Sequence, residues 1–335
     1  SGNTDGKLTI NKKDLTISNI TANNKTYDGT TTATLSNSGT LVGLVTGEDL
    51  VLNNPTSVIF SSKDVGDNIN VTATGYTIAD KDSFKASNYN LLDTSKTTTA
   101  NISKASLTAT LNDNSKTYDG TSYSGGNGIT FNGFVNGETA SVLGGTLVYS
   151  GTSQGAKDAG NYIISGSGLT SNNYNISFVD GKLTINKKDL TISNITANNK
   201  TYDGTTTATL SNSGTLVGLV TGEDLVLNNP TSVIFSSKDV GDNINVTATG
   251  YTIADKDSFK ASNYNLLDTS KTTTANIVAS VNPTPNPTPN PTPNPTPTDN
   301  NEQVQRVVAS IEASTNSNSN SSSNQSLPNS LNSNI

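Results

Sequence analysis

The stretch NNKTYDGTTTATL occupies residues 23–35 and returns unchanged at residues 198–210. Its Asp-Gly pair favours a tight turn with positive φ at the glycine, and the alternating Ala, Thr and Leu that follow favour a strand. Extending the comparison outward, residues 5–102 and 180–277 are identical at every position. The sequence therefore predicts a duplicated β-unit, and this internal repeat determines how the rest of the chain is divided into units.

A third, divergent unit lies between the two copies. Four short blocks align across all three units, and each occurs at a similar spacing. The blocks are KTYDGT (25–30, 116–121, 200–205), G-[LF]-V-x-G-E (43–48, 133–138, 218–223), K-D-[VA]-G (63–66, 157–160, 238–241) and NYN (88–90, 173–175, 263–265). One fold used three times, with loops of different length, explains this arrangement.

The strand signals are strong within each unit. INVTATGYTI (69–78) alternates apolar and polar residues, and DLTISNI (14–20) and KLTI (7–10, 182–185) do the same. Asp-Gly, Asn-Gly and Gly-Gly pairs between them suit tight turns. Helical periodicity is absent through residue 281, so we expect small antiparallel β-modules, either β-grasp-like or immunoglobulin-like sandwiches.

The joints between units contain no flexible linker. TTTANI of the first unit is followed by SKASLTATL at 103–111, and KLTINKK of the second is followed by DLTISNI at 189–195. Short joints of two to four residues restrict rotation between domains. We therefore expect a tandem array in an elongated, semi-rigid rod.

Composition changes abruptly after the third unit. NPTPNPTPNPTPNPTPT, from residue 282, has proline at every second position and favours polyproline II. In NEQVQRVVASIEAS (301–314) the apolar residues fall at helical spacing, and the Ser/Asn-rich end has the composition of disordered chain. We expect a linker, one short amphipathic helix and a disordered tail.

These observations give six predicted segments. Because DGKLTINKK (5–13) repeats the end of the middle unit (180–188), we expect residues 1–13 to be the last strand of a preceding middle-type module, and the natural array to be longer. The other segments are a first module (14–102), a middle module (103–187), a third module identical to the first (188–277), a Pro-rich linker (278–300) and the helix with its tail (301–335).

Composition excludes several classes of chemistry. The 335 residues include no Cys, His, Met or Trp. Disulfides, thiolate metal sites and His-dependent nucleophilic schemes are therefore excluded, and no cofactor is expected. The net charge of −7 and a single arginine, Arg306, do not suit nucleic-acid binding. No apolar run is long enough for a membrane span.

The repeated blocks resemble the YDG-type and MBG-type modules of filamentous-haemagglutinin-like bacterial adhesins. The YDG resemblance rests on NNKTYDGTTTATL and on GYTIADKDSFKASNYNL (75–91, 250–266); the MBG resemblance rests on KTYDGTSYSG (116–125) and on residues 157–187. The resemblance covers residues 5–277. It implies β-spacer modules, secretion with an outer-membrane partner of the two-partner class, and display at the bacterial surface in association with the outer membrane.

Two functional hypotheses remain at this point. The first is a non-catalytic stalk of a secreted adhesin, serving adhesion, biofilm formation or host attachment while other regions contact a host or matrix receptor of glycan or protein. The second is that the modules themselves bind glycan or matrix, with Ca²⁺ in one version, or self-associate through exposed edge strands. We do not expect an enzyme.

The candidate site residues are structural. The tyrosine of each KTYDG block should pack as a half-buried side chain, and Asp-Gly should form the turn; these residues are Tyr27, Asp28, Gly29, Tyr118, Asp119, Gly120, Tyr202, Asp203 and Gly204. The recurring carboxylates Glu48, Asp64, Asp67, Glu223, Asp239 and Asp242 are expected in solvated turns. The weak calcium candidates are Asp80, Asp82, Asp255 and Asp257, although the glycine and distal glutamate of a calcium loop are missing.

Overall fold

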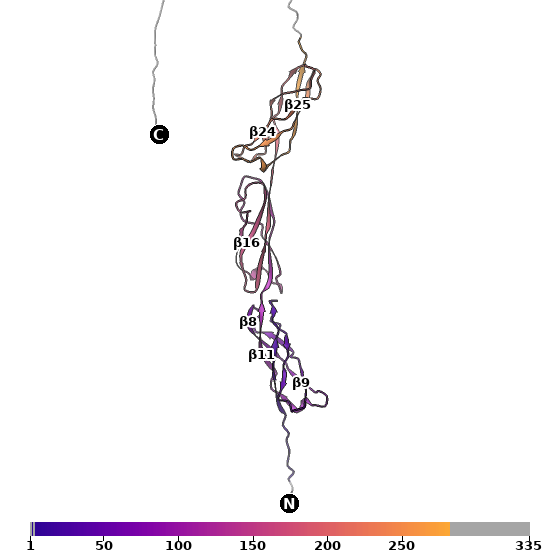
Figure 1. Ribbon diagram of the computed structural model, residues 1–335, viewed down its shortest axis with the longest axis vertical. Helices are drawn as coiled ribbons and strands as arrows, with labels where there is room; N and C mark the ends of the chain where they lie inside the picture. Colours follow the sequence, from indigo (N-terminus) through magenta and orange to yellow (C-terminus); the bar gives the residue numbers. More distant parts are fainter. Residues whose placement is uncertain (1, 3, 282–335) are drawn as a thin grey trace, which may run out of the picture. The chain divides into compact units, whose positions relative to one another are not determined.

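The computed structural model describes residue 2 and residues 4–281. Within these residues the protein is built from strands (Figure 1). The only helical elements among the described residues are three 3₁₀ turns. The 3₁₀ turns are η1 (Ala86–Asn88), η2 (Ala140–Val142) and η3 (Ala261–Asn263). The prediction of a tandem all-β array is confirmed. The helix and tail predicted at 301–335, and the linker from residue 282 onward, lie outside the described residues.

Module 1 forms two main sheets and two short ribbons. The sheets have the strand orders β10-β1-β5 and β3-β11-β8-β7, and the ribbons are β2–β4 and β6–β9. The strands are β1 (Lys13–Ser18), β2 (Thr21–Ala22), β3 (Lys25–Thr26), β4 (Leu35–Asn37), β5 (Thr40–Val42), β6 (Val51–Asn53), β7 (Ser57–Phe60), β8 (Gly66–Thr74), β9 (Thr77–Ala79), β10 (Tyr89–Leu91) and β11 (Ser95–Ser103).

Module 2 is simpler, with the strand orders β14-β12-β17 and β13-β18-β16-β15. Its strands are β12 (Ala105–Leu111), β13 (Asn114–Thr117), β14 (Ile129–Asn132), β15 (Gly144–Ser150), β16 (Gly160–Thr170), β17 (Tyr174–Val179) and β18 (Gly181–Asn186). It has the same pair of sheets as module 1 without the ribbons, because its loops are shorter.

Module 3 repeats the arrangement of module 1, with the sheets β23-β19-β28 and β21-β29-β26-β25 and the ribbons β20–β22 and β24–β27. Its strands are β19 (Lys188–Ser193), β20 (Thr196–Ala197), β21 (Lys200–Thr201), β22 (Leu210–Asn212), β23 (Thr215–Val217), β24 (Val226–Asn228), β25 (Ser232–Phe235), β26 (Gly241–Thr249), β27 (Thr252–Ala254), β28 (Tyr264–Leu266) and β29 (Ser270–Val278).

The two main sheets of each module face each other across an apolar core. In module 1, Ile17 of β1 packs in one cluster with Ala73 of β8 and with Tyr76. In module 2, Leu111 of β12 packs with Ile164 of β16. Two facing sheets, without an α-helix among the described residues, make each module a β-sandwich.

Strand pairing is mixed rather than purely antiparallel. The first strand of each module pairs in parallel with a strand near the end of the same module: β1 with β10, β12 with β17 and β19 with β28. The KTYDG strands β3, β13 and β21 also pair in parallel with the last strands. Long connections allow parallel pairing, and period-two alternation is the same in both kinds of ladder.

No strand forms at residues 7–10, where alternation predicts one. Leu8 is 84% exposed and Ile10 is 87% exposed, whereas the equivalent Leu183 and Ile185 of β18 are buried between β13 and β16. A strand needs partner strands to hold its hydrogen bonds and cover its apolar face. The described residues offer none to this segment, so residues 5–12, called here the N-terminal arm, have no regular structure.

Among the described residues, none of the helical elements has the length and apolar character needed to cross a bilayer.

Candidate functional site

The KTYDG blocks form similar corners in the three modules, with the same lysine and threonine contacts to the aspartate Oδ1. Gly29 has a φ of 74°, a conformation that favours glycine, as predicted from the Asp-Gly pair. The Asp28 Oδ1 accepts hydrogen bonds from the backbone N–H of Thr30 at 2.9 Å and from the Lys25 Nζ at 2.7 Å. The Lys25 Nζ also lies 5.5 Å from the centre of the Phe60 ring. The corner is thereby fixed, and it holds the tyrosine side chain in a defined direction.

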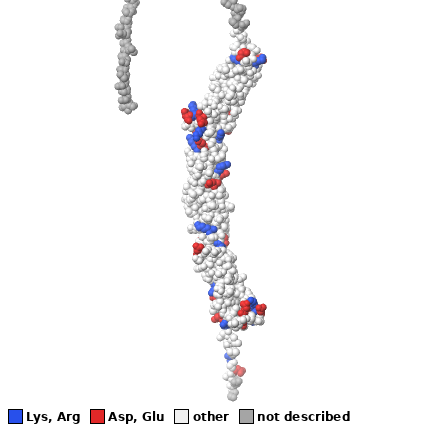
Figure 2. All heavy atoms as spheres, in the orientation of Figure 1, with Lys and Arg blue, Asp and Glu red and all other residues white. Residues whose placement is uncertain are grey.

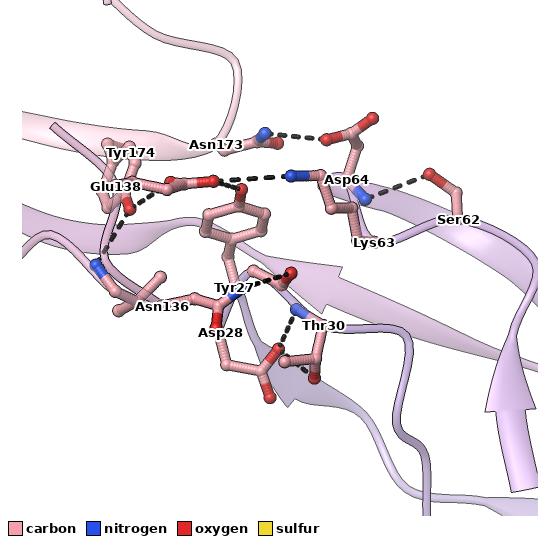
Figure 3. Close-up of polar contacts among 12 residues, drawn as sticks. Tyr27, Asp28, Thr30, Ser62, Lys63, Asp64, Asn136, Glu138, Asn173 and Tyr174 are labelled. Carbon is pink, nitrogen blue, oxygen red and sulfur yellow. Dashed lines mark hydrogen bonds and ion pairs between the residues drawn. The ribbon is translucent and has the colours of Figure 1, made fainter. Parts of the chain in front are cut away.

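The tyrosine of this corner reaches the next module. The Tyr27 hydroxyl donates to the Glu138 Oε1 at 2.6 Å, and the Tyr174 hydroxyl donates to the Glu138 Oε2 at 2.6 Å (Figure 3). The two rings meet edge to face, 5.5 Å apart. The Lys63 Nζ lies 3.5 Å from the Glu138 Oε1. We call this arrangement of two tyrosines around one glutamate the tyrosine clamp.

A second contact fixes the same joint. The Asn173 Oδ1 accepts from the backbone N–H of Val65 at 3.0 Å, and the Asn173 Nδ2 donates to the Asp64 Oδ1 at 2.8 Å. Figure 3 shows this pair beside the clamp. One asparagine side chain therefore satisfies both a backbone donor and a carboxylate of the preceding module.

The joint between modules 2 and 3 repeats both contacts. The hydroxyls of Tyr118 and Tyr264 donate to the two carboxylate oxygens of Glu223, at 2.7 Å and 2.6 Å. The Asn263 side chain accepts from the backbone N–H of Ala159 at 2.7 Å and donates to Asp158 at 2.9 Å. The contacts between modules 1 and 2 therefore recur between modules 2 and 3, although the order of the two module types is reversed.

The apolar core continues through each joint. One cluster joins Tyr27 and Ile102 of module 1 to Leu107 and Tyr174 of module 2. Another joins Leu111, Tyr118, Ile164, Leu183 and Ile185 of module 2 to Leu190, Leu225 and Tyr264 of module 3. A single residue, Lys104 or Lys187, separates the last strand of one module from the first strand of the next. The joints are therefore packed interfaces rather than tethers.

The identical sequences of modules 1 and 3 show what a neighbour changes. Tyr27 faces module 2 and is 2% exposed, whereas the equivalent Tyr202 is 42% exposed. Asn263 faces module 2 and is 1% exposed, whereas the equivalent Asn88 is exposed. Since the sequences are the same, contact with module 2 accounts for these differences.

Burial and hydrogen bonding shift the pKa values of the clamp. Burial raises the pKa of the Tyr27 hydroxyl, and its hydrogen bond to the Glu138 carboxylate raises it further. Burial, followed by the hydrogen bond to Glu223, raises the pKa of Tyr264 to about 12. Burial acts to raise the pKa of Glu138, but the hydrogen bonds from Tyr174 and Tyr27, together with Lys63, outweigh it, and the net pKa lies below its usual 4.5. Near neutral pH the clamp therefore holds an ionised carboxylate between two protonated tyrosines.

The joints bring together all four sequence blocks. Each joint takes its tyrosine and its K-D-[VA]-G loop from the preceding module, and its glutamate and N-Y pair from the following one. The predicted Tyr-Asp-Gly residues lie at these corners. Tyr27 and Tyr118 are buried rather than half-buried, because a neighbouring module covers them.

Sequence reasoning misses the glutamates. It places Glu223 in a solvated turn and does not single out Glu138, yet both lie at the centre of a clamp. Tyr174 and Tyr264 stand out only as parts of a recurring block. The available signal is that the four blocks recur together, which indicates a shared contact, but the residues concerned lie more than one hundred positions apart in the chain.

Two of the four calcium candidates, Asp80 and Asp255, accept hydrogen bonds from protein groups. The Asp80 carboxylate accepts from the backbone N–H of Ala86 at 2.8 Å and from the Lys85 Nζ at 3.0 Å, and these contacts lower its pKa. Asp255 accepts from the backbone N–H of Ala261 at 2.7 Å. Asp82 and Asp257 have positive φ at the turns of the same loops. Residue 2 and residues 4–281 contain no group of three or more acidic, His or Cys side chains arranged to hold a metal.

Charge is sparse on the surface. Figure 2 shows small groups of acidic and basic side chains, often of both signs together, separated by broad uncharged areas. Pairs such as Lys116–Asp119 and Lys260–Asp158 account for part of this pairing. On the face drawn in Figure 2, no continuous basic area follows the chain, as phosphate binding would require.

The fold and joints define a tandem repeat protein of β-sandwich modules. Its chain belongs to the YDG domain family, whose model matches residues 11–100 and 186–275. The model of the MBG domain (YGX type) matches residues 107–184, between the two YDG domains. Comparison with curated proteins finds no match.

Proposed function

We propose that this chain is a non-catalytic stalk of a secreted bacterial surface adhesin, in which stacked YDG and MBG modules hold a binding domain away from the cell. The observation that carries the proposal is the repeated joint. Both joints use a tyrosine clamp, an Asn–Asp contact and a continuous apolar core, with one residue between adjoining strands. A repeated, packed joint restricts bending between modules, and this is the property that a spacer needs.

The duplication supports the same conclusion. Residues 5–102 and 180–277 are identical, so the array gains length without gaining a different surface. The buried tyrosines and the paired carboxylates are engaged in contacts between and within modules. Secretion through an outer-membrane partner, display at the cell surface and recognition of a host or matrix receptor by other regions belong to this proposal and follow from the resemblance to surface adhesins.

Small-angle X-ray scattering of the full chain tests the stalk. A compact chain of this length has a radius of gyration of about 20 Å, and we expect a value at least roughly twice as large, with a narrow cross-section. The double substitution Glu138→Ala and Glu223→Ala should reduce the maximum dimension, because the joints lose their clamps. The Pro-rich and Ser/Asn-rich segment is the same in both proteins, so its contribution cancels in the comparison. A radius near the compact value would reject the stalk.

A further inference from the structure

One surface of module 1 is uncovered, although module 2 covers the equivalent surface of module 3. In module 3, Glu223, Tyr264, Asn263 and Val220 contact module 2. Their equivalents in module 1 are Glu48, Tyr89, Asn88 and Val45. Val45 is 47% exposed and Asn88 is exposed, whereas Val220 is partly buried and Asn263 is buried. We call the set Val45, Glu48, Asn88 and Tyr89 the acceptor face.

The acceptor face already has half of a clamp. The Tyr89 hydroxyl donates to the Glu48 Oε2 and accepts from the backbone N–H of Val45 at 3.2 Å. In module 3, the equivalent Tyr264 makes the same two contacts. The second oxygen of Glu223 accepts the Tyr118 hydroxyl from module 2, which is the contact that the acceptor face lacks within the described residues. The other carboxylate oxygen of Glu48 is thus positioned to accept a hydrogen bond from one more tyrosine.

The apolar core ends at the same place. In module 1 the cluster of Leu15, Leu50 and Tyr89 contains residues of module 1 only. In module 3 the equivalent Leu190, Leu225 and Tyr264 belong to one cluster with module 2, which includes Leu183 and Ile185 of β18. The core of an MBG module therefore covers Leu190 in module 3, and the equivalent Leu15 has no such neighbour among the described residues.

The N-terminal arm carries part of that missing core. Residues 5–13 have the same sequence as residues 180–188, so Leu8 and Ile10 correspond to Leu183 and Ile185. The arm leads directly into β1, as β18 leads into β19 with one residue between. Both apolar side chains are exposed, Leu8 by 84% and Ile10 by 87%, and in sequence they correspond to the buried side chains of the last strand of an MBG module.

We propose that the acceptor face and the N-terminal arm together bind an MBG-type module. The arm supplies the last strand of that module, between the strands equivalent to β13 and β16. The module places the tyrosine of its KTYDG corner against the free oxygen of Glu48, and its K-D-A-G loop against Asn88. The joint between modules 2 and 3 is the template for this proposal, because its module 3 side has the same sequence as the acceptor face.

The test extends the full chain with a copy of residues 103–179 placed directly before Asp5. The chain has no cysteine, so Ile10→Cys provides a single thiol whose alkylation rate reports burial of the arm. In the unextended protein the thiol should react rapidly. In the extended protein its rate should fall at least about a hundredfold, toward that of Ile185→Cys in β18 of the unextended chain. Adding Glu48→Ala to the extended protein should raise the rate again, by about tenfold.

Three outcomes would overturn the proposal. Equal alkylation rates in the extended and unextended proteins would show that the arm does not become a strand. A protected thiol whose rate is unchanged by Glu48→Ala would show that the acceptor face takes no part. A thiol that becomes protected in the unextended protein as its concentration rises, together with a dimer in sedimentation velocity, would identify a second copy of the chain as the occupant instead.

Discussion

At the scale of single residues, the tyrosine clamp shows how a surface motif becomes an interface. A tyrosine offers a large apolar ring and one hydroxyl, so it can enter a core while its polar end finds a partner. Tyr27 uses both parts, because its ring packs on Tyr174 and its hydroxyl donates to Glu138. The carboxylate needs such donors, since a buried charge without hydrogen bonds is costly.

The identical modules provide a matched test of this clamp. Tyr27→Phe removes the hydroxyl that donates to the Glu138 Oε1, and we expect a loss of about 1.5–3 kcal/mol in the free energy of unfolding, the range for hydrogen bonds to charged groups. Tyr202→Phe changes the same local sequence where the side chain is 42% exposed, and it should change stability by less than about 0.5 kcal/mol. Urea denaturation of both variants measures the difference. Equal effects would show that the hydroxyl acts within its own module.

At the scale of strands and loops, the sequence predicted what repeats locally and missed what spans modules. Alternation located β8, where Val71 and Ala73 are buried as expected, and the Asp-Gly pair located the turn at Gly29. Glu138 and Tyr27 are 111 positions apart, and their pairing depends on how two modules meet. No local periodicity carries that information, and for the same reason alternation did not reveal the parallel pairing of β1 with β10.

Only one residue separates the last strand of a module from the first strand of the next, so an insertion at this position should loosen the joint. Inserting Gly-Ser-Gly-Ser after Lys104 separates β11 from β12 and adds flexible chain to the joint. Because the protein has no cysteine, Thr97→Cys and Ser150→Cys can carry a pair of spin labels in modules 1 and 2. We expect the distribution of distances between the labels to broaden at least roughly twofold on insertion.

The same insertion after Asp82, an exposed turn residue of module 1, is the control for that measurement. It should leave the distribution narrow, because it changes neither the joint nor the strands that carry the labels. A broad distribution in the parent protein would contradict the view that the joint restricts motion, whatever the insertion does.

At the scale of the whole molecule, the two joints make the array respond to pH at defined points. Each joint depends on carboxylates that are ionised near neutral pH. The pKa of Glu138 lies below its usual 4.5 because of its hydrogen bonds, and that of Asp158 lies below its usual 3.8, first because of the Lys260 ammonium and then because of Asn263. A depressed carboxyl pKa stabilises the folded joint above the unfolded value, and this contribution is lost as pH falls through the folded value.

The opposite sign applies to the tyrosines. Burial, followed by the hydrogen bond to Glu138, raises the pKa of Tyr174 above its usual 10.0. A raised pKa of a donor means that the contribution is complete below the unfolded value and is lost as pH rises through the folded one. Loss of the proton would also place a phenolate beside the Glu138 carboxylate. The first joint should therefore be at full strength from about pH 5 to about pH 10.

The spin-label pair in modules 1 and 2 can measure this window directly. From about pH 7 to about pH 5 the distance distribution should stay narrow, and from about pH 4.5 to about pH 3 it should broaden while circular dichroism still reports folded sheets, because the joint loses its charge-assisted contacts before the cores of the sandwiches unfold. Glu138→Gln removes the titrating group from the clamp, so its distribution should be broader near neutral pH and change less on acidification. A parent distribution that stays narrow until the sheets unfold would show that packing alone, from Tyr27 and Ile102 to Leu107 and Tyr174, holds the first joint.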